Sequence, residues 1–329
     1  MMDNTLVDES IRLLNEVLKE DPDHYIARYE LCYAYGLKGD DQQVVNMLEK
    51  LKKHPEADAL LYQMLGNSYD NLDKTQKAVR AYKAGLKKFP ASGNLYTELG
   101  TVAYNDRKYE QAFGYYEEGI RRDPKFPSNY YRAASVLFDY SYETVWGMLY
   151  GELFMNLERN SERTEKMGKL LYDSYKQNIR TAPAGSPDTA RAVKVTFTKD
   201  QAIRLDGKNI ALPFAQVYEL TVGLAFPPDS DRVDPDALYR MRSRFLDIYY
   251  DNKHNVTYPN VLFDYQQKIR EAGHFEAYTY WLLGPGDEKA FENWYETHAS
   301  AWDEFIEWYQ AHPIEIDENH RFCRTQYDE

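Results

Sequence analysis

Apolar and polar positions in the first half of the chain repeat with a spacing of 34 residues. The matched pairs are Tyr62 and Tyr96, Leu65 and Leu99, Gly66 and Gly100, Ala78 and Ala112, Tyr82 and Tyr116, Gly85 and Gly119, and Pro90 and Pro124. Within each copy the apolar residues follow one another at helical intervals, which predicts two amphipathic helices per copy. A period of this length indicates stacked helical units that share one continuous core.

The order of an aromatic residue, Leu-Gly, Ala, a second aromatic residue and Pro at this spacing resembles the tetratricopeptide repeat (TPR). The resemblance implies an α-solenoid of antiparallel helix pairs and a role in binding other proteins. Repeats are expected near 25–58, 59–92, 93–126 and 127–160, preceded by a capping helix at 5–22 whose outer face is polar. A closing helix at 161–179, with Ser161 as its N-cap, completes a solenoid domain at 5–180.

The fourth repeat departs from the pattern, because Trp146 stands where Ala78 and Ala112 stand in their repeats. Gly147 and Gly151 are expected to form the close-packing face instead. Apolar residues continue from there to about residue 159, so we expect a helix longer than a TPR helix, whose extra turn packs on something outside the repeats. The segment 146–159 is also similar to a segment of bacterial TPR proteins, a resemblance that implies no activity.

The second half of the chain begins with a change of pattern. Residues 181–192 are rich in Pro, Gly and small residues and indicate a linker. Alternation at 193–198 predicts a strand, and segments 202–205 and 210–212 around Asp206-Gly207 predict a hairpin. Helices are expected to follow as far as residue 313, which makes 193–313 a small antiparallel β-sheet with a helical module, and residues 314–329 a loose polar tail. The fold class is therefore mainly α.

Composition narrows the classes of partner and compartment. The net charge of −13 argues against nucleic acid and against an anionic membrane surface. No apolar run is long enough for a transmembrane helix, and the first residues do not have the pattern of a signal peptide. Cys32 stands at the small position that Gly66 and Gly100 occupy, so we expect a buried free thiol, as in a reducing, cytoplasmic compartment.

The sequence contains no motif typical of a catalytic, phosphate-binding or zinc-binding site, and we expect no catalysis, no metal and no cofactor. Glu152 interrupts an apolar face, for which a buried ion pair or an exposed contact is favoured over a catalytic role. Aromatic residues at helical spacing between 291 and 309 favour core packing, and His298 among them favours a hydrogen-bonded core histidine.

The resemblance also implies a concave groove, lined by the first helix of each repeat at its second, fifth, ninth, twelfth and thirteenth positions. The corresponding residues are Tyr29, Tyr33, Gln63, Asn67, Asp70, Asn71, Asn94, Thr97, Thr101, Tyr104, Asn105, Tyr131, Ser135, Phe138 and Asp139. Amide side chains offer both donors and acceptors to an extended peptide backbone. A solenoid surface that is simply polar explains the same composition, and this alternative stays open.

Some TPR domains bind the C-terminal carboxylate of a partner protein through a set of Lys, Asn and Arg residues. Here Asn67 matches one of those positions, but Gln63 and Glu98 replace two others and most of the basic residues are missing. We therefore expect a neutral or basic protein or peptide in the groove of a non-catalytic adaptor. Two alternatives stay open: an enzymatic or small-molecule module around Glu152 or His298, and a homodimer formed through the long helix or the aromatic last helix.

Overall fold

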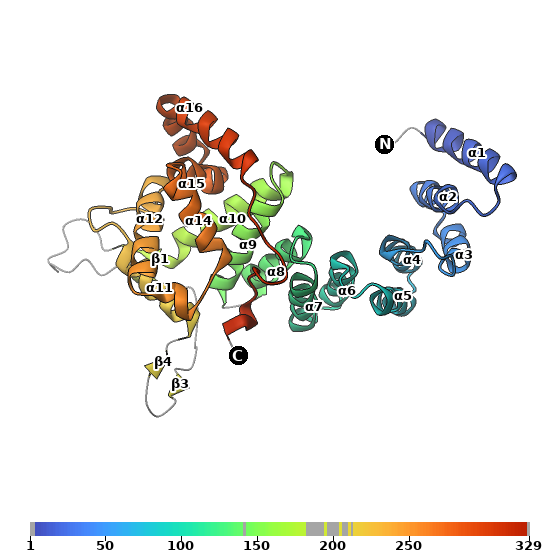
Figure 1. Cartoon of the computed structure of the whole chain (residues 1–329), viewed down its shortest axis with the longest axis horizontal. Helices are drawn as coiled ribbons and strands as arrows, with labels where there is room; N and C mark the ends of the chain where they lie inside the picture. The colour runs from blue at the N-terminus through green and yellow to red at the C-terminus, as the bar shows by residue number, and fades with distance from the viewer. Residues whose placement is uncertain are drawn as a thin grey trace. The chain divides into compact units, whose positions relative to one another are not determined.

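The computed structural model describes residues 4–140, 143–181, 194–195, 204–205, 210–211 and 213–327. The chain is mainly helical and divides by packing into two compact units, Met1–Asp123 and Pro124–Glu329 (Figure 1). The fourth expected repeat and the closing helix thus belong to the same compact unit as the C-terminal helices. Because most of residues 181–192 lie outside the described ranges, the linker stays a prediction.

The first unit contains one helix followed by three helix pairs. The elements are α1 (Asn4–Glu20), α2 (Tyr25–Leu37), α3 (Asp41–Leu51), α4 (Ala59–Asn71), α5 (Thr75–Lys88), α6 (Gly93–Asn105) and α7 (Tyr109–Arg122). The first helices α2, α4 and α6 begin at a spacing of 34 residues, and polar residues before several helices accept from their first free amides. Asp58, for example, accepts from the amide of Leu61 at 3.0 Å.

Each helix pair of the repeats closes through a small residue on the first helix. A Cβ atom at Gly66 would lie 2.0 Å from Cε1 of Tyr82, and one at Gly100 would lie 2.2 Å from Cε1 of Tyr116. The tyrosine ring therefore occupies the space that a side chain would need. In the first repeat, Cys32 takes the glycine position and is fully buried. This confirms the expectation drawn from its register.

The turn within each pair also repeats. Gly39 has a φ of +76°, and Asp73 and Arg107, one and two repeats later, have φ values of +57° and +61°. This left-handed conformation costs little for glycine and more for other residues. Asp73 and Arg107 adopt this conformation despite its cost, because the packing of the two helices fixes where the turn must reverse.

The capping helix α1 does not have the uniformly polar outer face that the sequence predicted. Val7 is buried against its neighbours, and Leu14 is half-buried. On an adjacent side of the same helix, Leu6, Leu13 and Val17 are exposed by 68%, 48% and 41% of their surface. The expectation is wrong because α1 carries two apolar stripes and only one of them is covered.

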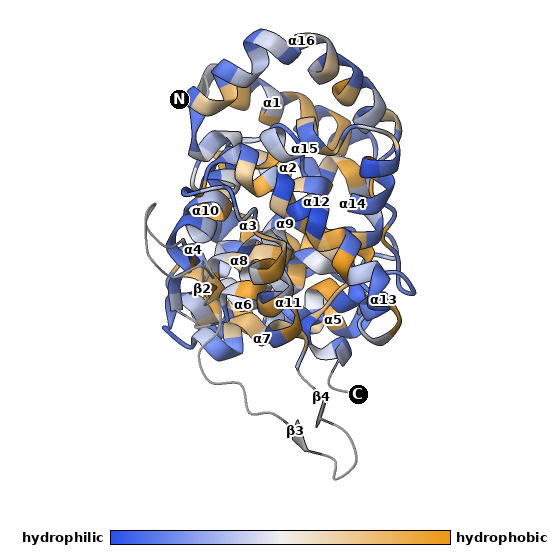
Figure 2. Cartoon of the chain, turned by 90° about the vertical axis from the view of Figure 1, so that its left-hand side faces the viewer, coloured by the Kyte–Doolittle hydropathy of each residue, from blue (hydrophilic) through white to orange (hydrophobic). Residues whose placement is uncertain are grey.

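The second unit is built mainly from helices α8 to α16. The helices are α8 (Pro127–Tyr140), α9 (Thr144–Leu157), α10 (Glu162–Asn178), α11 (Phe214–Ala225), α12 (Pro235–Asp251), α13 (His254–Thr257), α14 (Val261–Glu271), α15 (Phe275–Leu283) and α16 (Glu288–Ala311), with 3-10 turns η1 (Gly284–Gly286) and η2 (Arg324–Tyr327). Helices such as α11 and α14 are rich in apolar residues (Figure 2), of which Phe214, Val222, Leu262 and Phe263 are buried. Ser161 caps α10, as expected, in a reciprocal capping box with Thr164.

Helix α9 is not longer than a repeat helix, which corrects the prediction. It has 14 residues, as α5 and α7 have. Its twelve residues from Val145 to Asn156 are all buried. The long run of apolar residues does not reflect a longer helix. The run is apolar because the helix is buried on every side. Gly147 and Gly151 do form close contacts, since Cβ atoms there would lie 3.3 Å from Leu137 and 2.7 Å from Met167.

Only short strands are found where the sequence predicted a small sheet. In the described part, β1 (Ile179–Arg180) pairs antiparallel with β2 (Lys194–Val195), and β3 (Arg204–Leu205) pairs antiparallel with β4 (Ile210–Ala211). The turn at 206–207 and the other residues of the expected strands lie outside the described ranges. Two-residue pairs do not confirm a sheet.

The C-terminal residues are not a loose tail, contrary to the prediction. Phe322 is fully buried, and its ring lies 5.8 Å from that of Trp146 and 5.7 Å from that of Tyr150. The backbone amide of Arg324 donates to the hydroxyl of Tyr150 at 2.8 Å. The segment is polar in composition, but its few apolar residues are the ones that pack.

Candidate functional site

The predicted groove positions of the first unit lie on α2, α4 and α6. Tyr29, Gln63, Asn67, Asp70, Asn94, Thr97, Thr101 and Tyr104 are half-buried, and Tyr33, Asn71 and Asn105 are exposed. None of these positions carries a cation, and Asp70 carries a negative charge. The predicted face therefore offers amides, hydroxyls and carboxylate to any ligand that lies against it.

Two of the predicted amides bridge neighbouring repeats. The side chain of Asn94 on α6 donates to Oε1 of Gln63 on α4 at 2.8 Å. In turn, Gln63 donates to Oε1 of Glu98 at 2.7 Å. From the sequence, Glu98 was expected only to depart from the carboxylate-binding pattern. Its position one helical turn after Asn94, opposite Gln63, is the signal that could have identified it as a bridging residue.

Three other amides keep more of their hydrogen-bonding capacity. The hydroxyl of Tyr82 donates to Oδ1 of Asn67 at 2.6 Å, which orients the amide and leaves its two N–H groups available. The side chain of Asn71 donates to Asp41 at 3.1 Å. No hydrogen bond of the Asn105 side chain is found within the described ranges.

The hydroxyl groups of the predicted face are less available. Those of Thr97 and Thr101 donate to backbone carbonyls of their own helix at 3.1 and 2.9 Å. Among the tyrosines, Tyr33 is 50% exposed. Burial, followed by the charge of Asp58, raises the pKa of Tyr29 to about 12, so this hydroxyl is neutral at physiological pH.

The groove positions of the fourth repeat belong to the second unit. The ring of Tyr131 on α8 lies 5.0 Å from that of Phe154, and the guanidinium of Arg163 lies 5.2 Å above it. The hydroxyl of Ser135 donates to the carbonyl of Tyr131 at 2.8 Å. Phe138 is half-buried, and Asp139 is exposed. The guanidinium of Arg163, which was not predicted here from the sequence, is paired with the carboxylate of Glu158.

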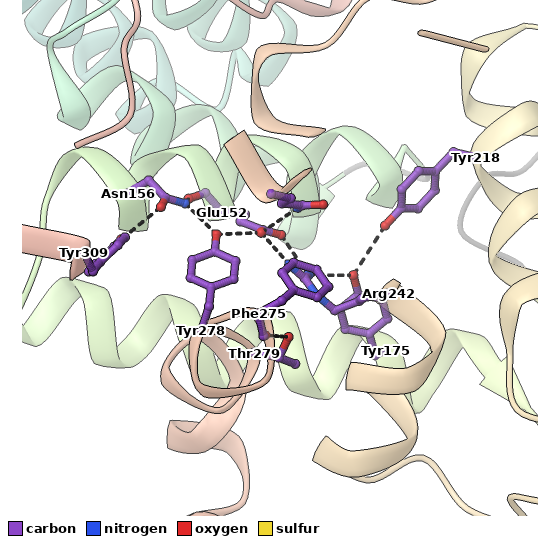
Figure 3. A network of polar contacts seen from close by, with 10 residues as sticks. Glu152, Asn156, Tyr175, Tyr218, Arg242, Phe275, Tyr278, Thr279 and Tyr309 are labelled. Atoms are coloured by element: carbon purple, nitrogen blue, oxygen red, sulfur yellow. Dashed lines mark hydrogen bonds and ion pairs between the residues drawn. The ribbon is translucent and has the colours of Figure 1, made fainter. Parts of the chain in front are cut away.

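Glu152 forms a buried ion pair, as favoured from its place on an apolar helix face. Its two carboxylate oxygens accept from Nη2 and Nη1 of Arg242 at 2.6 and 2.9 Å (Figure 3). Gln266 and Tyr278 donate to the same carboxylate at 2.7 and 2.8 Å. Burial alone would lower the pKa of Arg242, but the Glu152 carboxylate raises it well above its ordinary value.

This ion pair is the centre of a larger polar network inside the second unit. Asn156 donates to the hydroxyl of Tyr278 at 2.8 Å and accepts from that of Tyr309 at 2.9 Å, so α9, α15 and α16 are joined (Figure 3). Arg242 was not predicted from the sequence to take part in this network. Its spacing from Leu238 and Phe245, the apolar stripe of α12, was the available signal.

His298 is not a core residue, although it is hydrogen-bonded as expected. It is half-buried at a kink of α16, where its φ and ψ are −126° and 22°. Its ring is stacked on that of Trp294 at 4.9 Å. The aromatic stripe of α16 is core only in part, since Trp294, Phe305 and Tyr309 are buried while Tyr295 is 39% exposed.

An open pocket of about 560 Å³ lies beside this helix, and neither Glu152 nor His298 lines it. Its walls combine aromatic residues such as Trp281 and Trp302 with the carboxylates of Glu162 and Glu165. No cluster of potential metal ligands is found in the described part of the chain. None of the described helices is both long enough and apolar enough to cross a membrane.

Comparison with known proteins places the repeats in a family. Residues 64–127 match the family model described as tetratricopeptide repeat. Human tetratricopeptide repeat protein 21B is 23% identical over 119 residues, which are 36% of this chain and 9% of that protein. A DnaJ homolog subfamily C member 3 homolog from Dictyostelium discoideum is 25% identical over 134 residues, which are 37% of this chain and 26% of that protein. The chain therefore spans about a quarter or less of the length of these relatives.

Several solved structures align with about half of this chain, at low identity and with TM-scores below 0.5. A crystal structure of MamA is 22% identical, with 46% of this chain and 88% of that chain covered and a TM-score of 0.39. PilF of Pseudomonas aeruginosa is 19% identical, with 51% and 84% covered and a TM-score of 0.42. YrrB, described as a TPR protein with an unusual peptide-binding site, is 14% identical, with 48% and 81% covered and a TM-score of 0.36. The match to the tetratricopeptide repeat model falls on the helix pairs whose glycine–tyrosine packing recurs at 34 residues, so residues 64–127 have the sequence and the packing of tetratricopeptide repeats.

Proposed function

We propose that this chain is a non-catalytic adaptor that binds a protein or peptide on the face formed by α2, α4 and α6. The observation that carries the proposal is that the amide side chains on this face fall into two groups. Gln63 and Asn94 hold neighbouring repeats together, whereas Asn67, Asn71 and Asn105 keep unused hydrogen-bonding groups at the surface. An oriented amide at a helix surface pairs with an extended peptide backbone without regard to its side chains.

The charge of this face favours a neutral or basic ligand. Asp70 and Glu98 lie on it, and the predicted positions of the first unit contain no Lys or Arg. An anionic ligand would meet like charges there without a compensating cation. The partner is thus expected to be a neutral or basic segment, and the tyrosines contribute contact area at a low entropic cost.

The surroundings of Glu152 and His298, on which the enzymatic alternative was based, argue against it. The carboxylate of Glu152 accepts from three side chains and is 4% exposed, so it has no access to a substrate. His298 does not line the pocket beside α16. We also place the protein in a reducing compartment such as the cytoplasm, since Cys32 and Cys323 are both buried free thiols. The alternative of a homodimer is tested separately by measuring the molecular mass of the protein in solution.

The test is simultaneous replacement of Asn67, Asn71 and Asn105 by alanine. Loss of three partner hydrogen bonds should weaken binding by about 3 kcal/mol, roughly a hundredfold in Kd. Tagged full-length chain is used to recover partners from lysate, which are identified by mass spectrometry, and the Kd of the main partner is then measured with both proteins.

The matched control carries alanine at Gln76, Lys83 and Lys87, which are exposed on α5. This control should recover the same partners as the unmodified chain. If the asparagine variant, folded as judged by circular dichroism, recovered them equally well, the assignment of binding to this face would be wrong.

A further inference from the structure

A pocket of about 740 Å³ on the first unit is lined by residues of α3, α4 and α5 and of the turn that follows α3. Its lining includes the buried side chains of Tyr62 and Leu65 and five cationic side chains. The cationic residues are Lys52, Lys53, Lys77, Arg80 and Lys88. The residues of α4 that line this pocket differ from the predicted groove positions of that helix, so the pocket is a second surface.

The composition of the chain does not explain this concentration of positive charge. The net charge of the whole chain is −13, yet α5 contains five basic residues and no acidic residue. The carboxylate of Glu49 also lines the pocket, but it already accepts from Nζ of Lys52 at 2.5 Å and from the hydroxyl of Tyr69 at 3.0 Å. A cluster of charges of one sign around a pocket attracts ligands of the opposite sign.

The other four cations have no carboxylate partner within the described ranges. These are Lys53, Lys77, Arg80 and Lys88. Nζ of Lys77 lies 5.6 Å from the ring centre of Tyr69, and Nζ of Lys88 lies 5.4 Å from that of Tyr62. Because the two tyrosines are about two turns apart on α4, the two ammonium groups lie at opposite ends of the pocket.

The next repeat contains the carboxylate that this pocket lacks. Ala84 and Lys88 stand one 34-residue repeat before Glu118 and Arg122. There, Nε of Arg122 donates to Oε1 of Glu118 at 2.8 Å, so the cation is paired within its own helix. In α5 the acidic residue is replaced by alanine, and Lys88 keeps its charge without a carboxylate. A ligand can supply the missing group.

The space in the pocket also arises from a replacement within the repeat. Ala81 stands one repeat before Tyr115, whose half-buried side chain packs against the apolar core of the first unit. The small side chain of Ala81 leaves space where the next repeat has a ring. Complete helix pairs precede and follow α4 and α5, so neither the space nor the unpaired charge results from an end of the solenoid.

We propose that this pocket binds an extended acidic segment of a partner protein, with a carboxylate at each end and an apolar side chain between them. The carboxylates pair with the unpaired cations, and the apolar side chain lies against Tyr62 and Leu65. The site is independent of the face formed by α2, α4 and α6, whose proposed ligand is neutral or basic.

The distance between the cations indicates a peptide segment rather than a single anionic group. Lys77 and Lys88 are separated by about 16 Å along α5, and the tyrosines beside them by about 10 Å along α4. One carboxylate does not reach both ends. In an extended chain, residues four positions apart are separated by about 13 Å and point to the same side, as does the residue midway between them. A long nucleic acid is disfavoured, because the acidic remainder of the chain would repel it.

The probe is a fluorescein-labelled peptide, Glu-Glu-Ser-Phe-Ser-Glu-Glu, which has a carboxylate two residues to either side of its phenylalanine. One comparison peptide has Gln in place of every Glu, and a second has Ser in place of Phe. Binding to the full-length chain is measured by fluorescence anisotropy at an ionic strength of about 0.1 M, where charges more than about 10 Å apart are largely screened. The Glu peptide should bind at least about tenfold more tightly than the Gln peptide and about fivefold more tightly than the Ser peptide.

Charge reversal at two exposed residues of the pocket is the main variant. Lys77→Glu combined with Arg80→Glu should weaken binding of the Glu peptide by at least about tenfold. The matched control is Lys83→Glu combined with Lys87→Glu, which makes the same change of charge on the same helix at exposed positions outside the pocket lining. This control should change the Kd by less than about threefold.

Two further variants separate the space from the charge and this site from the proposed groove. Ala81→Tyr leaves every charge in place and introduces the residue of the next repeat, so a variant that is folded by circular dichroism should bind the Glu peptide at least about fivefold more weakly. The alanine variant of Asn67, Asn71 and Asn105 should bind the Glu peptide as the unmodified chain does. Each site can therefore fail while the other holds.

Four outcomes would overturn the proposal. The first is no binding of the Glu peptide, and the second is equal binding of the Glu and Gln peptides. The third is an oligothymidylate that displaces the labelled peptide at a lower concentration than the unlabelled peptide does, since a nucleic acid would then be the ligand. The fourth is a dimer of the chain in light scattering that Lys77→Glu with Arg80→Glu dissociates, since an acidic surface of a second copy would then occupy the pocket.

Discussion

At the scale of single residues, the small positions of the repeat decide how closely the paired helices approach. Gly66 and Gly100 each face a tyrosine ring at a distance that leaves no room for a methyl group. Cys32 takes the same position in the first repeat, where burial raises the pKa of its thiol to about 12. The sequence predicted this burial from the register alone, because a fixed period transfers the environment of one residue to its counterparts.

Gly66→Ala should destabilise the chain by about 2 kcal/mol, because the new methyl group must displace the buried ring of Tyr82. Gly114→Ala on α7 is the matched control, since a Cβ atom there meets nothing within 4 Å. That change should stabilise the chain by about 0.5–1 kcal/mol through helix propensity. Urea unfolding followed by circular dichroism measures both. Equal stability of the two variants would show that the close approach at Gly66 is not needed.

At the scale of elements, burial and not length distinguishes α9 from the other repeat helices. Trp146 replaces the alanine of the repeat, and its ring lies 5.3 Å from that of Phe214 and 5.8 Å from that of Phe322. The sequence indicated correctly that this position departs from the repeat. It could not show that residues far along the chain, including the C-terminal segment, would cover the helix.

Phe322→Ala should lower the free energy of unfolding by about 3–5 kcal/mol, the usual cost of removing a buried phenylalanine ring. Thermal and urea denaturation measure the loss, and hydrogen exchange of residues 314–327 should rise at the same time. Glu318→Ala, at an exposed position of the same segment, should change the stability by no more than about 0.5 kcal/mol. An unchanged stability of Phe322→Ala would mean that the segment is loose in solution.

At the scale of the whole molecule, the chain consists of two compact units with different interiors. The first unit repeats one apolar packing arrangement. The second unit has a polar network around Glu152 and Arg242 and several buried tyrosines. Burial raises the pKa of Tyr218, Tyr278 and Tyr309 well above the ordinary value of 10.0, although the charge of Arg159 acts in the opposite direction on Tyr309.

The sign of these pKa shifts predicts a loss of stability in alkali. The unfolded chain releases the tyrosine protons near pH 10, while the folded chain retains them, so the free energy of unfolding is unaffected below that pH and falls above it. Urea midpoints measured between pH 8 and 11 should decline from about pH 10. Tyr309→Phe should be less stable at neutral pH but decline less steeply, and an equal slope for both proteins would contradict the assignment.

The sequence by itself determined the 34-residue repeat and the small buried positions of the first unit. Each repeat contacts its neighbours mainly through residues close in sequence, so a local pattern carries the three-dimensional information. It also predicted which residues line a groove, but it could not show that Gln63 would accept a hydrogen bond from Asn94 and donate one to Glu98.

Only the tertiary structure decided the rest. It paired Glu152 with Arg242, placed Phe322 against α9, and left one apolar stripe of α1 uncovered. The first two contacts join residues that are far apart in sequence, and the exposure of the stripe depends on which elements pack against α1. Composition and periodicity do not record either one, because they describe which residues can be buried and not which neighbour buries them.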